Sequence, residues 1–103
     1  MTSITEWIDA AQKRCDAATE GPWVAVEGAT PGMFWVELRH RATICDFPRE
    51  QGAQEDAEFI AAARTDLPAA LAALRAVLDE HPGCEADTCL TVGAIAAALG
   101  VAP

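Results

Sequence analysis

The clearest structural signal in the chain is Met33-Phe34-Trp35-Val36-Glu37-Leu38-Arg39, a run rich in β-forming residues. Successive side chains of a strand point to opposite faces, so the run separates into two sets. One set is entirely apolar: Phe34, Val36 and Leu38. The other is mixed: Trp35, Glu37 and Arg39. This alternation predicts a strand in a sheet that is covered on one side.

Two neighbouring runs extend this strand into a sheet. Residues 23–26 are β-rich and are separated from the run by a turn cluster at 28–32, which predicts a hairpin. A third β-rich run, residues 42–47, follows the polar pair His40-Arg41. We therefore expect three antiparallel strands in this part of the chain.

An N-terminal helix is expected before the sheet. Ser3-Ile4-Thr5-Glu6 matches a capping box, in which the Ser3 hydroxyl and the Glu6 carboxylate each satisfy a backbone N–H of the first turn. Apolar residues then recur at three- and four-residue spacing through Ala18. The helix is expected to end at Glu20-Gly21-Pro22, because proline disfavours a helical residue before it.

Helical patterns also follow the last strand. One covers residues 53–64, and a Leu-rich one covers residues 67–78. Between them, Thr65-Asp66-Leu67-Pro68 offers a cap and a first-turn proline, so the two segments form either one kinked helix or two. A last helix is expected over residues 92–99, with Thr91 as its cap.

These elements predict an α+β fold: a small antiparallel sheet of three to four strands, with an N-terminal helix and C-terminal helices packed on one face. The length of 103 residues suits a single domain, residues 1–103, with one shared core. The expected core is apolar and comes from the strands and the later helices: Phe34, Val36, Leu38, Ile44, Phe59, Ile60, Leu67, Leu71 and Leu74. Because the Leu-bearing helix face offers more apolar area than a small sheet covers, we expect a homo-oligomer.

The charge balance disfavours one class of partner. Sixteen acidic residues face seven basic ones, a formal net charge of −9, which repels the phosphate backbones of DNA and RNA. The N-terminus has no signal-peptide pattern, and no window of about 18 uninterrupted apolar residues occurs. The sequence therefore predicts a cytoplasmic protein without a membrane anchor.

The sequence shows no catalytic arrangement. Neither of the two histidines lies beside a plausible nucleophile, and no Gly-rich phosphate loop occurs, so we expect no enzyme, no catalytic residue and no cofactor. His81, Cys84 and Cys89 have zinc-like chemistry, but a closed zinc site needs a fourth ligand from elsewhere in the chain. Free thiols are the favoured interpretation, and a zinc-stabilised module is an open alternative.

The distribution of the few cations indicates a candidate ligand site. Its members combine arginines with aromatic rings of the sheet region and the following helix: Trp35, Arg39, Arg41, Phe47, Arg49 and Arg64. Guanidinium groups match phosphate oxygens, and aromatic faces stack on bases. We therefore expect a small anionic nucleotide, with its base against Trp35 or Phe47. The competing interpretation is that these arginines pair with the abundant carboxylates and the aromatic rings lie in the core.

Two motifs resemble a known family. Gly21-Pro22-Trp23 and Asp56-Ala57-Glu58-Phe59-Ile60-Ala61-Ala62-Ala63-Arg64-Thr65-Asp66-Leu67-Pro68 are similar to segments of the Ead-like small accessory proteins of phages and actinobacterial prophages. The resemblance covers residues 19–81 and leaves 82–103 as a C-terminal extension. It implies a phage origin and does not itself fix an activity.

The organisation of the chain also resembles the Thoeris anti-defence proteins of phages. Those small oligomeric sponges sequester a glycocyclic ADP-ribose signal, or in some members cyclic oligonucleotides, without cleaving it. They pair a small antiparallel sheet with C-terminal helices and bind between protomers through Arg and aromatic side chains. This resemblance implies a nucleotide sponge. The alternative function is inhibition of a host protein by direct binding, through the acidic surface and the apolar tail.

Overall fold

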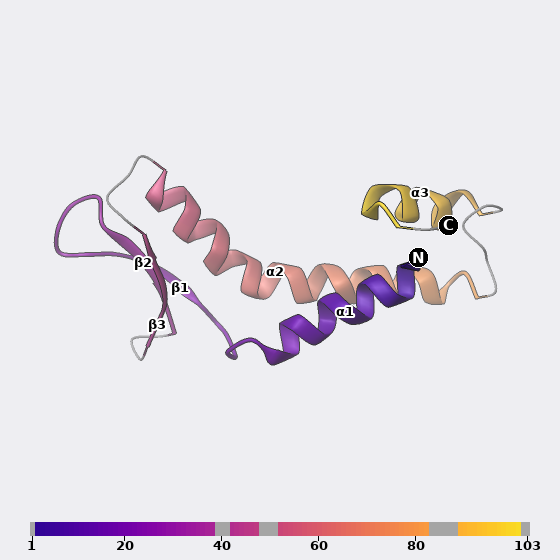
Figure 1. Cartoon of the computed structure of the whole chain (residues 1–103), viewed down its shortest axis with the longest axis horizontal. Helices are drawn as coiled ribbons and strands as arrows, with labels where there is room; N and C mark the ends of the chain where they lie inside the picture. Colours follow the sequence, from indigo (N-terminus) through magenta and orange to yellow (C-terminus); the bar gives the residue numbers. More distant parts are fainter. Residues whose placement is uncertain (1, 39–41, 48–51, 83–88, 102–103) are drawn as a thin grey trace. The chain divides into compact units, whose positions relative to one another are not determined.

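The computed structural model describes residues 2–38, 42–47, 52–82 and 89–101 (Figure 1). Its elements, in chain order, are α1 (Ile4–Ala17), β1 (Val24–Glu27), β2 (Phe34–Glu37), β3 (Thr43–Phe47), α2 (Ala53–Asp79) and α3 (Leu90–Leu99). An N-terminal helix, a three-stranded antiparallel sheet and C-terminal helices make an α+β arrangement, so the predicted fold class is confirmed.

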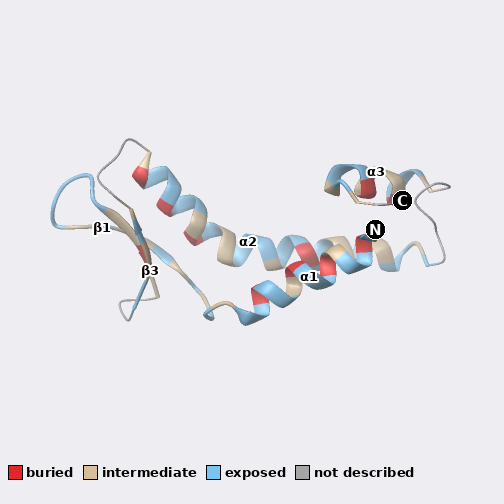
Figure 2. Ribbon diagram, in the orientation of Figure 1, coloured by how far each residue is buried: buried red, intermediate tan, exposed pale blue. Residues whose placement is uncertain are grey.

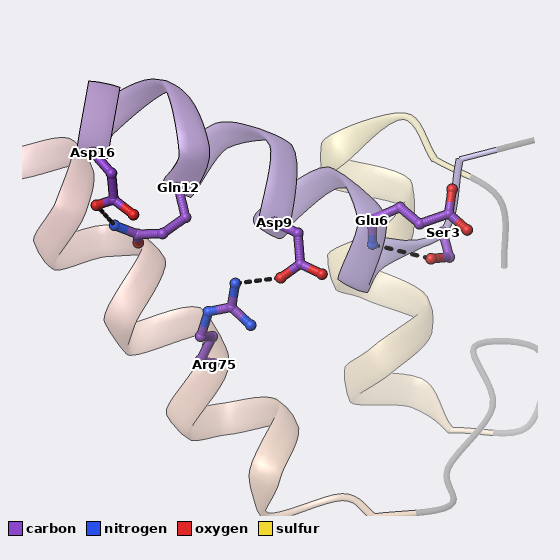
Figure 3. A network of polar contacts seen from close by, with 6 residues as sticks. All are labelled: Ser3, Glu6, Asp9, Gln12, Asp16 and Arg75. Atoms are coloured by element: carbon purple, nitrogen blue, oxygen red, sulfur yellow. Dashed lines mark hydrogen bonds and ion pairs between the residues drawn. The ribbon is translucent and has the colours of Figure 1, made fainter. Parts of the chain in front are cut away.

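Helix α1 begins where its capping box predicts, with one of the two predicted capping hydrogen bonds present among the described residues. The Ser3 hydroxyl oxygen accepts a hydrogen bond from the Glu6 backbone N–H at 3.1 Å (Figure 3). The buried residues of the helix recur every three or four positions: Ile4, Ile8, Ala11 and Cys15. The helix ends at Ala17, and the N–H of Ala18 donates to the Arg14 carbonyl oxygen. Sequence-local capping and a single apolar stripe therefore account for this helix.

The three strands pair in the order β1-β2-β3, and both pairs are antiparallel. Val36 lies opposite Ala25 on one side and Cys45 on the other. The register of β2 and β3 shifts between Val36 and Glu37. Val36 is fully buried, which fixes its face of the sheet as the covered one.

Helix α2 is one continuous helix with Pro68 inside it, so the alternative of two separate helices is wrong. Proline has no backbone N–H, so the Arg64 carbonyl one turn earlier cannot receive the usual helix hydrogen bond from this position. Among the helices of the described residues, α2 included, none combines the length and apolarity of a membrane span.

Helix α3 begins two residues earlier than its pattern predicts. Its N-cap is Cys89, which makes no side-chain cap hydrogen bond, and Thr91 lies inside the helix, so the predicted cap at Thr91 is wrong. The helix ends at Leu99 and is capped by Gly100, whose φ of 69° is left-handed and suits a residue without a Cβ.

The chain divides into two compact units, each with its own buried cluster. One unit comprises Met1–Ala18 and Pro68–Pro103, and the other comprises Thr19–Leu67. The first cluster draws on α1, α2 and α3: Ile4, Ile8, Ala11, Cys15, Leu71, Val92 and Ala96. The second joins the sheet to the first half of α2: Val36, Ala57 and Ala61. The structure thus has two buried clusters, whereas the sequence predicted one shared core. The assignment of residues 1–103 to a single domain stays a prediction.

The predicted core is right at its centre and wrong at two positions of α2. Val36 and Leu71 are fully buried, and five other members are half-buried: Phe34, Leu38, Ile44, Ile60 and Leu74. Phe59 is 74% exposed and Leu67 is 44% exposed. The sheet-facing stripe of α2 follows the alanines Ala57 and Ala61, and Figure 2 shows buried positions recurring along the part of α2 beside the sheet. Phe59 lies two residues beyond Ala57, about 200° around the helix, so it points away from the sheet.

The burial of Leu71 gives a direct test of the first cluster. We expect Leu71→Ala to lower the free energy of unfolding by about 2–5 kcal/mol, because it leaves a cavity between three helices. The matched control is Leu90→Ala, since Leu90 is 93% exposed, and it should cost about 0.5 kcal/mol or less. Urea denaturation followed by circular dichroism measures both. Equal losses for the two variants would contradict the packing described for α2.

Candidate ligand-binding site

Arg64 is held by two groups from the segment that leads into the sheet. Its Nε donates a hydrogen bond to the Thr19 carbonyl oxygen at 3.0 Å. Its guanidinium carbon lies 5.9 Å from the ring centroid of Trp23. The Trp23 indole N–H donates to the same Thr19 carbonyl at 3.1 Å. One backbone oxygen therefore accepts from both side chains and orients the cation over the ring.

Gly21 allows the arginine side chain to lie close to the backbone. A Cβ at Gly21 would stand 3.0 Å from Cγ of Arg64, closer than ordinary van der Waals contact. Any larger residue here would push the arginine stem aside. The two sequence motifs noted above thus meet in space, because Gly21 and Trp23 belong to one and Arg64 to the other.

Sequence reasoning missed Trp23 as a member of this group. Its indole is half-buried and packs at the edge of the cluster formed by the sheet and α2. One sequence signal pointed to Trp23: the motif that contains it and the motif that contains Arg64 both resemble segments of the same family. Spacing alone gives no reason to join residues that lie about forty positions apart, since the contact depends on how the helix lies on the sheet.

The described arginines differ in how they are neutralised. Arg75 forms an ion pair with Asp9, with 2.6 Å between Nη2 and Oδ1 (Figure 3). Arg64 makes no ion pair with a carboxylate among the residues that the structure describes. The interpretation that the arginines serve the abundant acids therefore fits Arg75 and does not fit Arg64.

Trp35 lies on the opposite face of the sheet from α2. Its indole N–H donates to Oε2 of Glu37 at 2.9 Å, and Asp46 is its register partner on β3. On β1 its partner is Val26, and a Cβ at Gly28 would stand 2.6 Å from the Trp35 ring. Two carboxylates, those of Glu37 and Asp46, thus lie beside Trp35, and this is a poor setting for phosphate.

Phe47 lies on the other face. Its register partner is Phe34, and it packs against the cluster that contains Val36 and Ala57. The structure therefore separates Trp35 from Phe47 by the thickness of the sheet. Arg64 belongs to the helix that covers the Phe47 side. The remaining predicted site residues, Arg39, Arg41 and Arg49, lie outside the described residues.

The cysteine-histidine cluster is described in part. Sγ of Cys89 lies 3.6 Å from Nδ1 of His81, so the expectation that neither histidine lies beside a nucleophile is wrong for His81. Cys84 lies outside the described residues. Over residues 2–38, 42–47, 52–82 and 89–101, no group of three or more His, Cys, Asp and Glu side chains is placed to hold a metal ion. The zinc-stabilised module stays an alternative that rests on the sequence.

The chain matches no protein-family model, and comparison with curated proteins and with solved structures likewise finds no match. The resemblances to Ead-like proteins and to Thoeris anti-defence proteins therefore stay predictions.

The thiol of Cys45 gives a test of the sheet environment. Burial raises the pKa of Cys45, and the neighbouring Asp46 carboxylate raises this pKa further. We expect the midpoint of its alkylation by iodoacetamide to lie at higher pH in the folded protein than in urea, because the thiolate is the reacting form. Asp46→Asn should move that midpoint to lower pH. Peptide mass spectrometry distinguishes Cys45 from the other cysteines.

The sign of the linked stability effect follows from the same shift. A raised pKa of the folded thiol favours its neutral form, so the contribution of Cys45 to stability is complete below the pKa of the unfolded thiol and is lost as pH rises through the pKa of the folded thiol. A folded midpoint at or below the unfolded one would contradict the burial of Cys45.

Proposed function

We propose that the protein is a non-catalytic binding protein that captures a small anionic cyclic nucleotide. The observation that carries the proposal is the state of Arg64. In a chain of net charge −9, this guanidinium is held by a carbonyl and an aromatic ring and is not neutralised by a carboxylate of the described residues. A hydrogen bond at Nε orients the group, so its terminal N–H donors are arranged for an anion at low entropic cost.

Affinity for such a ligand requires more than one arginine. A charge-assisted hydrogen bond contributes about 1.5–3 kcal/mol, and association costs several kcal/mol, so nanomolar binding needs three or four such contacts and a stacked base. The proposal assigns the further phosphate contacts to Arg39, Arg41 and Arg49. The proposal assigns the stacked base to Trp23 or Phe47 in preference to Trp35, because Trp35 lies beside the carboxylates of Glu37 and Asp46.

The proposal extends to origin, location and assembly. It describes a phage-derived anti-defence sponge that acts in the host cytoplasm on a glycocyclic ADP-ribose signal or a cyclic oligonucleotide. Sequestration requires slow release of the ligand and no catalytic group. The ligand would lie between protomers of a homo-oligomer, where arginines of two chains can contact the same phosphate groups.

Calorimetry tests the proposal. The purified protein is titrated with isomers of glycocyclic ADP-ribose and with cyclic di- and trinucleotides, and the ligand is recovered after heat denaturation. We expect one ligand class to bind and to be recovered intact. Arg64→Gln should weaken binding by about tenfold or more, because a phosphate contact is lost, while the control Arg75→Gln should leave it unchanged.

Three results would contradict this function. A cleaved product would make the protein an enzyme, and the absence of heat with every ligand would favour binding to a host protein. If Arg64→Gln and Arg75→Gln changed the ligand affinity equally, Arg64 would not be a residue of the binding site. A thermal melt of each unliganded variant separates loss of binding from loss of folding. Light scattering measures the mass in solution, which should be at least twice the 10.9 kDa mass of the chain if the protein is a homo-oligomer.

A further inference from the structure

Phe59 is the most exposed aromatic side chain of the described residues, at 74%. It lies on α2 within the unit Thr19–Leu67, on the side of the helix opposite the stripe that packs against the sheet. An exposed phenylalanine in the second turn of a well-formed helix contributes nothing to the core. A single exposed apolar side chain is common, whereas one that belongs to a wider apolar surface marks an interaction site.

Further apolar residues share this side of the helix. Ala63 lies one turn after Phe59 on the helix. Leu67 lies two turns after Phe59 and is 44% exposed. Ala62 is also exposed and lies beside them. We call Phe59, Ala62, Ala63 and Leu67 the Phe59 face. Residues at these spacings are the anchors of a helix that lies in an apolar groove, with Phe59 as the large one.

The rim of the Phe59 face is acidic. Glu55 and Asp56 lie one turn before Phe59, and Asp66 lies two turns after it, and all three are exposed. The one basic residue between positions 53 and 67 is Arg64, whose guanidinium is held over Trp23. Arg64 follows Ala57 and Ala61 at helical spacing, so it lies on the opposite side of α2 from Phe59. No basic side chain between positions 53 and 67 therefore lies on the same side of α2 as these carboxylates to neutralise them.

We propose that the Phe59 face docks into an apolar groove of a different protein whose rim carries lysines or arginines. Charge decides this occupant. A second copy of the chain would bring the same acidic rim against this one, and juxtaposed like charges oppose association. A basic rim would instead speed the encounter and match the three carboxylates, while the groove buries the phenylalanine ring.

This interaction is independent of the nucleotide proposed above. Phe59 and Arg64 occupy different sides of α2, so substitution of Phe59 leaves the contacts of Arg64 with Thr19 and Trp23 in place. A variant at Phe59 should lose the protein partner and keep any nucleotide affinity. An experiment can therefore contradict the nucleotide proposal without contradicting the Phe59 proposal, and the reverse.

Site-specific photocrosslinking tests the inference. The full chain carrying p-benzoylphenylalanine at position 59 is irradiated in bacterial cells, and the matched control carries the same residue at exposed position 29 in the β1–β2 turn. We expect a product specific to position 59 that joins the chain to another protein, through a peptide that contains both apolar and basic residues.

The captured protein is then purified and titrated with the intact chain. Phe59→Ala should weaken binding tenfold or more, and so should the triple variant Glu55→Gln, Asp56→Asn, Asp66→Asn, with the loss from the triple variant shrinking at high salt. Ala29→Ser should bind as the parent chain does. A position-59 product that joins two copies of the chain, no product above the control, or a triple variant that binds normally would overturn the inference.

Discussion

The hydrogen bond from Arg64 to the Thr19 carbonyl, with the guanidinium lying over Trp23, connects the beginning of the sheet-containing unit to the helix that covers it. The Arg64–Thr19 hydrogen bond joins residues 45 positions apart. They fix which side of α2 faces the sheet, because Arg64 and the buried alanines Ala57 and Ala61 share one stripe. The orientation of the helix, and with it the exposure of Phe59, depends on this arrangement.

One helix therefore presents two chemically different sides. The side that meets the sheet carries small residues and a cation that no described carboxylate neutralises. The other side carries an exposed aromatic ring within an acidic rim. In the two proposals, the first side contributes to a site for an anionic small molecule and the second docks on a basic protein surface, so two binding chemistries would be kept apart on one helix.

Local patterns predicted the elements well apart from the Thr91 cap of α3, and the two errors in the predicted core have a common cause. The Ser3 cap and the alternation in β2 are properties of adjacent residues, and both are present in the structure. Phe59 and Leu67 were assigned to the core because they are large and apolar. The helix instead packs through alanines, which let the backbone approach the sheet closely and turn the larger side chains outward. Trp23 joins Arg64 only through that packing, so no spacing rule reveals it.

The most direct test of this account is a double-mutant cycle between Arg64→Gln and Trp23→Leu, measured by urea denaturation. The account predicts that the losses are not additive and that the coupling is about 0.5–1 kcal/mol, as expected for a cation over a partly exposed ring. A cycle of Trp23→Leu with Arg75→Gln serves as the reference and should be additive within about 0.5 kcal/mol. Additive losses for the Arg64 and Trp23 pair would contradict the claim that their contact fixes α2 on the sheet.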